Sequence, residues 1–392
     1  MAKPAVYPAA RGQCSASGRE RHFRLFNVRE KLHAAAMSAP SSAPEHNYNF
    51  ASDNTAGIAP EAWAALAAAN TGRTPSYGDD PWTARAQQLI CEIFERECEI
   101  FFVFNGTAAN ALALAHLCRS YQAILCHNFS HVDTDECSAP EFFTGGAKVI
   151  PIAGPCGKLR TADLEPIFRQ EHGVHYPKPG VLSLTQSTEW GTVYTPAEIR
   201  ALSDFAQAKG LAVHMDGARF ANAAAALAAR GYKPADFTWR AGVDVLCFGG
   251  TKNGMNTTEA VVFFNREQAR DFKFRVKQSA QLASKQRFAA AQWCGMLENG
   301  AWLRHAAHAN ALAQELTAAV RRLPSLQLIV EPEVNGVFVE MATATAQALT
   351  AKGWQFLPFL TPQGYRFMCS WATERAELAR FIADLEAVVA AG

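Results

Sequence analysis

The stretch Val245-Leu-Cys-Phe-Gly-Gly-Thr-Lys252 decides which fold this sequence can adopt. An apolar run ends there in two glycines and a lysine, and the earlier apolar run Leu211-Ala-Val-His-Met215 ends as abruptly at Asp216. Short apolar runs bounded by turn residues are typical of buried strands in a parallel sheet. Because ligands of α/β proteins bind at the carboxyl ends of such strands, we expect Lys252 and Asp216 to meet at one sheet edge.

A lysine amine beside a carboxylate is the pair of groups that pyridoxal 5'-phosphate (PLP) requires. The amine forms a Schiff base with the cofactor aldehyde, and the acid keeps the pyridine nitrogen protonated so that the ring can accept electrons. The glycines at 249, 250 and 254 leave room around Lys252 for a ligand. For Asp216 the alternative is a purely structural ion pair with Arg219.

A third segment, Asn105-Gly-Thr-Ala-Ala-Asn110, follows an apolar run and opens a helical pattern. The backbone N–H groups and dipole at a helix start, together with the Thr107 hydroxyl, are suited to bind a phosphate. The alternative is a turn with an ordinary helix cap. Gly106 and Thr107 are therefore candidate phosphate ligands.

His131 lies soon after an expected strand, in the segment Cys126-His-Asn-Phe-Ser-His-Val-Asp-Thr-Asp-Glu136. An imidazole at this position can stack on a flat ring or move a proton, and His127 is close enough to compete for the role. The acidic residues that follow resemble metal ligands in composition. No second group of ligands has a suitable spacing, so we expect no metal site.

The composition points to a small-molecule ligand. The 392 residues are 49% hydrophobic, and 37 basic side chains balance 36 acidic ones, which argues against nucleic acid or an anionic membrane as the main partner. No apolar run approaches the roughly 18 residues that cross a bilayer. The ten cysteines have no CxxC pair and no metal-ligand spacing, so we expect reduced thiols and a cytoplasmic protein.

The chain divides into three parts by pattern. Residues 1–46 are basic and rich in Ser, Ala and Pro, and we expect a disordered extension, with a transit-type presequence as the alternative. Residues 47–275 alternate strands and helices, which predicts an α/β domain with a mainly parallel sheet flanked by helices. Residues 276–392 begin with an expected long helix, Gln281–Leu297, and predict a smaller α+β domain. Strands expected in the larger domain are Ile100–Phe104, Ala123–Cys126, Lys148–Ile152, Gly180–Leu184, Leu211–Met215, Val243–Phe248 and Ala260–Phe264.

Several motifs, taken in order, resemble those of the threonine aldolases, a family of fold-type-I PLP enzymes. The resemblance runs from about Tyr48 to the C-terminal helix, and the later segments look most like the bacterial low-specificity L-threonine aldolase branch. The motifs are Ser52-Asp-Asn, Tyr77-Gly-Asp-Asp-Pro81, Gly106-Thr-Ala-Ala-Asn110, Ser130-His131, His214-Met-Asp-Gly-Ala-Arg219, Thr251-Lys252, Lys277–Phe288, Asn335–Glu340 and Arg366–Trp371.

The resemblance implies cofactor roles for the matched residues. Lys252 would bind the PLP aldehyde, Asp216 would hold the pyridine nitrogen, and His131 would stack on the ring. The other cofactor ligands that it implies are Gly106, Thr107, Arg219 and Lys285.

The resemblance also implies how a substrate is held. Ser52 and Arg366 would receive its carboxylate, for which a planar guanidinium is well matched. Tyr77 and Lys285 would reach across a subunit interface, which implies a homodimer or homotetramer with shared active sites.

One position departs from the family pattern. Many members carry Thr-His-Asn-Gly where this chain reads Thr188-Glu-Trp-Gly191, so that Glu189 occupies the histidine position. The base that deprotonates the substrate hydroxyl is then Glu189, His131 or a water held between them.

The activity that the resemblance implies is cleavage of β-hydroxy-α-amino acids to glycine and an aldehyde. L-Threonine, L-allo-threonine and L-phenylserine are candidate substrates. A PLP-dependent β-eliminating lyase or hydroxymethyltransferase is the alternative within the same chemistry. A PLP-binding regulatory protein without catalysis is the alternative from another class.

Overall fold

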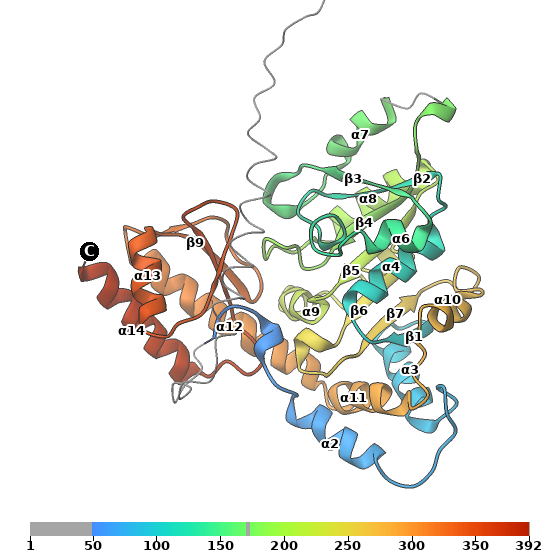
Figure 1. Ribbon diagram of the computed structural model, residues 1–392, viewed down its shortest axis with the longest axis horizontal. Coiled ribbons are helices and arrows are strands. Elements are labelled where there is room, and N and C mark those ends of the chain that lie inside the picture. The colour runs from blue at the N-terminus through green and yellow to red at the C-terminus, as the bar shows by residue number, and fades with distance from the viewer. Residues whose placement is uncertain (1–48, 170–172, 392) are drawn as a thin grey trace, which may run out of the picture. The chain divides into compact units, whose positions relative to one another are not determined.

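A seven-stranded sheet forms the first core of the computed structural model, which describes residues 49–169 and 173–391 (Figure 1). The strand order is β1-β7-β6-β5-β4-β2-β3, and all neighbours are parallel except the pairs that β7 makes with β1 and β6. The expected mainly parallel sheet is confirmed, whereas the extension expected over 1–46 lies outside the described residues. The strands are β1 Glu99–Val103, β2 Gln122–His127, β3 Lys148–Ile152, β4 Lys178–Thr185, β5 Ala212–Gly217, β6 Val245–Gly249 and β7 Glu259–Phe263.

Helices bury both faces of this sheet, which explains why its strands read as continuous apolar runs. In β6, Val245 and Cys247 pack in a cluster with residues of α4, whereas Leu246 and Phe248 pack in another with residues of α9 and α11. Successive side chains of a strand point to opposite faces, so both must be apolar here. The helices of this part are α2 Pro60–Ala69, α3 Pro81–Phe94, α4 Gly106–Leu117, α5 His131–Thr134, α6 Ala139–Thr144, α7 Thr161–Arg169, α8 Pro196–Ala208, α9 Phe220–Ala228, α10 Phe272–Gln278 and α11 Arg287–Glu298.

A four-stranded antiparallel sheet, ordered β10-β11-β9-β8, forms a second core with α12, α13 and α14 (Figure 1). The helix α12 joins the two cores, because its Trp302 packs in the first and its Leu312 in the second. The domain boundary at residue 275 therefore stays a prediction. The elements are α12 Ala301–Arg321, β8 Gln327–Leu328, β9 Gly336–Glu340, α13 Thr343–Ala351, β10 Leu357–Pro358, β11 Gly364–Met368 and α14 Arg375–Ala391.

The helix expected over Gln281–Leu297 was wrong at its start, because α11 begins at Arg287. Ala280 adopts a left-handed conformation with φ 62°, and the Gln281 side chain accepts a hydrogen bond of 2.9 Å from the Phe104 amide. Leu282 nevertheless packs against the first sheet. The apolar Leu282 is therefore packed against the core, but it lies in a loop rather than in a helix.

The segment that follows residue 48 connects the two cores. The Phe50 amide donates to the Gln355 carbonyl and the Phe50 carbonyl accepts from the Met368 amide, both at 2.8 Å, and the Phe50 ring is buried in the second core. The chain then enters the 3-10 helix η1 (Asp53–Thr55) and continues into α2 of the first core. Ser52 and Asp53 therefore lie where the two cores meet. No helix in the described part of the chain has the length and apolarity to cross a membrane.

Leu312→Ala should lower the free energy of unfolding by about 2–5 kcal/mol, because Leu312 is fully buried in the second core. Urea denaturation followed by circular dichroism measures the loss. Val174→Ala is the control, since Val174 is 97% exposed and should change stability by less than about 0.5 kcal/mol. A loss below about 1 kcal/mol for Leu312→Ala would show that this core contributes little to stability.

Candidate active site

Lys252 and Asp216 follow neighbouring parallel strands, as the sequence predicts. Asp216 is the penultimate residue of β5 and pairs in register with Cys247 of β6. Lys252 lies in the 3-10 helix η5 (Thr251–Asn253), three residues beyond the end of β6. The amine and the carboxylate thus belong to the same edge of the first sheet.

Glycines allow the backbone around Lys252 to pack closely. A Cβ atom on Gly249 would lie 2.4 Å from the Ala218 carbonyl oxygen, and one on Gly250 would lie 2.5 Å from that of Thr258. The Gly250 amide donates to Glu259 Oε2 at 2.6 Å. Burial raises the pKa of Glu259 to about 7, although hydrogen bonds and the Lys252 charge oppose the shift.

Asp216 is a buried carboxylate that neutral groups hold in place. Its Oδ1 accepts from the Ala218 amide at 2.9 Å, and its Oδ2 accepts from Asn110 Nδ2 at 3.0 Å. Within residues 49–169 and 173–391, no ion pair joins Asp216 to Arg219 or to another cation. The structural ion pair considered as its alternative role is therefore not formed.

His131 opens the short helix α5 and pairs with Glu136. His131 Nδ1 lies 3.0 Å from Glu136 Oε1, and the same oxygen accepts from Asn110 Nδ2 at 2.8 Å. Burial opposes protonation of His131, but the carboxylates of Glu136, Asp216 and Glu189 raise its pKa above the usual value. Burial also raises the pKa of Glu136. A chain of hydrogen bonds thus runs from His131 to Asp216.

Glu136 and Asn110 were missed as site residues by sequence reasoning. The sequence pattern suggests a metal ligand at Glu136 and a helix start around Asn110, and it does not indicate that the two side chains meet. The structure buries both side chains, with 3% of Glu136 and 2% of Asn110 exposed. The sequence signal that could have identified the pair was an acidic residue, Glu136, five positions after His131.

His127 does not share the site with His131. Its Nε2 lies 3.0 Å from the Gly154 carbonyl, and its Nδ1 accepts from the Phe129 amide at 3.1 Å. Burial lowers the pKa of His127. With both ring nitrogens engaged by backbone, His127 fixes the loop after β2.

Arg219 forms a buried, two-pronged ion pair with Asp53. Arg219 Nε lies 2.7 Å from Asp53 Oδ2, and Nη2 lies 3.0 Å from Oδ1. Burial disfavours both charges, yet the cations Arg219, Lys252 and Arg366 lower the pKa of Asp53, and its carboxylate raises that of Arg219. Glu189 Oε2 lies 3.9 Å from Arg219 Nη1. Asp53 was missed because its neighbour Ser52 was chosen from the same motif.

Ser52 and Arg366 lie beside this ion pair. The Ser52 hydroxyl caps η1 by accepting from the Asn54 amide at 3.2 Å, and it lies 3.4 Å from Asp53 Oδ1. Arg366 comes from β11 and donates through Nη2 to the Ala51 carbonyl at 3.0 Å. The structure therefore brings Ser52, Arg366 and Arg219 to one place from three distant segments.

Gly106 and Thr107 open α4, with Asn105 as the cap. The Asn105 side chain accepts from the Ala108 amide at 2.8 Å. The amides of Gly106 and Thr107 make no hydrogen bond with other described residues, and a Cβ atom on Gly106 would meet nothing within 4 Å. This helix start offers free N–H groups to an anion.

Tyr77 and Lys285 are not brought to this site within one chain. Tyr77 is 50% exposed, and Lys285 lies on the exposed loop before α11. The Tyr77 amide donates to the Ser284 carbonyl at 3.1 Å, so the two residues belong to loops that touch. In the part of the chain that the structure describes, neither side chain forms a hydrogen bond or ion pair with the groups around Lys252.

Comparison with known proteins yields a family model and close relatives. Residues 49–344 match the family described as beta-eliminating lyase. The chain is 52% and 51% identical over 347 residues to low specificity L-threonine aldolases of a Pseudomonas species and of Pseudomonas aeruginosa, matches that cover 88% of this chain and 99% of each relative. The solved structure of a threonine aldolase from Leishmania major superposes with a TM-score of 0.81 at 27% identity, covering 87% of this chain and 99% of that one.

Asp53→Ala should lower the free energy of unfolding by about 3–5 kcal/mol, because it removes the hydrogen-bonded partner of the buried Arg219 guanidinium and leaves only the Glu189 carboxylate, 3.9 Å away. Urea denaturation measures the loss. Asp204→Ala is the matched control, since Asp204 is 62% exposed and lies 3.9 Å from Arg200, so less than about 0.5 kcal/mol is expected. Equal stability of the two variants would show that the buried pair does not hold the fold together.

Proposed function

The chain belongs to the beta-eliminating lyase family, and from this membership and the geometry of the site we propose that it is a PLP-dependent aldehyde-lyase of the threonine aldolase type. It cleaves L-threonine, L-allo-threonine and related β-hydroxy-α-amino acids to glycine and an aldehyde. The observation that carries the proposal is the buried Asp216 carboxylate, held only by neutral donors, at the strand edge that also carries Lys252. A buried carboxylate is stable when a cation pairs with it, and a protonated pyridine nitrogen is such a cation.

The residues present fit PLP at each end of the cofactor. Lys252 would bind the aldehyde, and Asp216 would hold the pyridine nitrogen. The free amides of Gly106 and Thr107 would bind the phosphate, and His131 would lie against the ring. When bound, the cofactor supplies a ring that accepts the electrons released from the substrate Cα–Cβ bond.

Arg219 completes the cofactor contacts in this proposal. Its guanidinium, oriented by two hydrogen bonds to Asp53, would contact the ring oxygen of the cofactor. A guanidinium held in this way loses little further freedom when a ligand binds.

Arg366 and Ser52 would position the substrate. The planar guanidinium of Arg366 matches a carboxylate, and its hydrogen bond to the Ala51 carbonyl directs it toward Ser52. Holding the carboxylate in this way would fix the orientation of the substrate in the site. Trp190 and Phe129, with ring centroids 5.6 Å apart, would form an apolar wall for the aldehyde.

We propose that His131 is the base that accepts the proton of the substrate hydroxyl, and Glu189 is the alternative base. Glu136 fixes the His131 ring through Nδ1, which leaves Nε2 to meet a substrate. Glu189 lies 3.9 Å from Arg219 and is engaged there as a counter-charge. A histidine whose partner is a carboxylate is oriented for proton transfer.

A homo-oligomer would complete the site. Tyr77 and Lys285 lie on exposed, touching loops, as expected of residues that reach a neighbouring subunit. We propose a homodimer or homotetramer in which both residues serve the partner's active site.

We also propose a cytoplasmic location. The nine cysteines of the described residues are all free, which agrees with it.

The first experiment incubates the PLP-loaded protein with L-threonine and L-phenylserine and measures glycine and the aldehyde released. Lys252→Ala should lose the visible absorbance of bound PLP and lower turnover by about 1,000-fold or more, because the cofactor has lost its covalent anchor. Lys352→Ala is the control, since this lysine pairs with Asp384 on the surface and should leave both readouts unchanged. Normal turnover in Lys252→Ala would overturn the proposal. Pyruvate and ammonia released from L-serine, or a dependence on folate, would favour β-elimination or hydroxymethyl transfer instead.

Glu136→Gln should shift the acid limb of the kcat/KM profile to lower pH. The base must be neutral to accept a proton, so activity falls as the pH drops through the pKa of His131, which the Glu136 carboxylate raises. Removing that charge lowers the pKa and keeps His131 neutral at lower pH. An unmoved limb, together with loss of the limb in Glu189→Gln, would assign the base to Glu189.

A further inference from the structure

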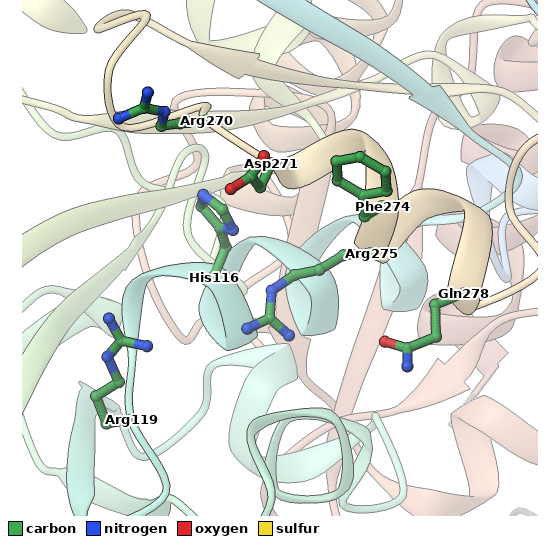
Figure 2. A pocket seen from close by; sticks show the side chains of 7 residues that line it. All are labelled: His116, Arg119, Arg270, Asp271, Phe274, Arg275 and Gln278. Carbon is green, nitrogen blue, oxygen red and sulfur yellow. The ribbon is translucent and has the colours of Figure 1, made fainter.

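A pocket lies at the C-terminal end of α4, the opposite end of this helix from the proposed phosphate site (Figure 2). Its volume is about 670 Å³, and it is lined by the last turn of α4, the loop that follows α4, the loop that precedes α10, and α10 as far as its last residue, Gln278. His116 is ten residues beyond Gly106 on α4, so the helix rise places the two about 15 Å apart. The pocket is therefore separate from the site around Lys252.

Positive charge dominates this pocket. Arg119, Arg270 and Arg275 line it, against the single carboxylate of Asp271. Figure 2 shows the Arg275 side chain reaching from α10 toward α4. Within residues 49–169 and 173–391, none of the three guanidinium groups forms an ion pair, whereas nearby Arg266 pairs with two glutamates at 3.1 and 3.3 Å. The pocket thus holds three guanidinium groups that no carboxylate of the described residues pairs with.

The lining groups respond to this excess charge. Burial lowers the pKa of Arg275, and the Arg119 charge lowers it further. Burial also lowers the pKa of His116. The charges of Arg275 and Arg119 add to that shift, while the Gln268 carbonyl and Asp271 oppose it. An anion between these groups would relieve the repulsion.

We infer that this pocket binds a small organic polyanion, a molecule with at least two phosphate or carboxylate groups. Guanidinium groups recognise both by paired hydrogen bonds. A volume of about 670 Å³ exceeds that of one inorganic phosphate and is typical of small-molecule sites. The Phe274 ring, 63% exposed at the same pocket, offers an apolar face to the rest of the molecule. The inference is independent of the chemistry at Lys252.

Calorimetric titration of the PLP-loaded protein with inorganic pyrophosphate and with citrate, at fixed ionic strength, tests the inference. Loading with PLP keeps the probes away from the start of α4. Saturable binding is expected, and the double variant Arg119→Gln/Arg270→Gln should weaken it about tenfold or more, because charge-assisted hydrogen bonds are lost. Both arginines are exposed, so the variant should keep the wild-type melting temperature.

Arg200→Gln is the matched control, because it removes one exposed arginine from α8, outside the pocket. Its affinity for either probe should stay within about twofold of wild type. Binding of pyrophosphate alone would identify a phosphorylated ligand, and binding of citrate alone a polycarboxylate. No saturable binding of either probe, or equal affinity in the double variant and the control, would overturn the inference.

Discussion

The buried ion pair between Asp53 and Arg219 is the interaction on which the site depends. Asp53 follows a segment whose Phe50 is packed in the second core, and Arg219 follows β5 of the first sheet. Breaking a buried pair leaves a desolvated charge, which is strongly unfavourable, so the two segments are held together although 166 residues separate the partners. Lys252 of the first core and Arg366 of the second both lower the pKa of Asp53, so no single core contains all the groups that the proposed reaction needs.

The helix α4 couples the remaining groups. Its first turn presents the free amides of Gly106 and Thr107, and one turn later Asn110 donates to both Glu136 and Asp216. Movement of α4 would therefore displace the proposed phosphate site, the support of His131 and the support of Asp216 together. Buried hydrogen bonds that share a donor group keep such a constellation in one geometry.

Features that depend on local sequence pattern were predicted, whereas contacts between residues distant in the chain were missed. Apolar runs that end near Asp216 and Lys252 were sufficient to predict the sheet and to place both residues at one of its edges. Asp53 could not be distinguished from Ser52, because its partner Arg219 is distant in the chain and a motif does not say which of its polar residues is buried. The helix start expected at Gln281 failed for a related reason, since a long-range hydrogen bond to the Phe104 amide competes with helix formation there. The roles proposed for Tyr77 and Lys285 require a second subunit, which no pattern within one chain can position.

The charges around the site also restrict the distribution of charge on a ligand that can bind there. Four carboxylates are buried there, those of Asp53, Glu136, Asp216 and Glu259, and only Asp53 is paired with a guanidinium. His131 partly balances Glu136, and Lys252 lowers the pKa of both Asp53 and Glu259. Asp216 remains without a cation among the described residues, while the start of α4 has N–H groups without an acceptor. A ligand with a positive charge at one end and an anionic group at the other satisfies both, and PLP with a protonated pyridine nitrogen has that distribution of charge. A neutral or uniformly anionic ligand would leave the buried Asp216 carboxylate without a cation, so the charges of this site favour a cofactor of this class.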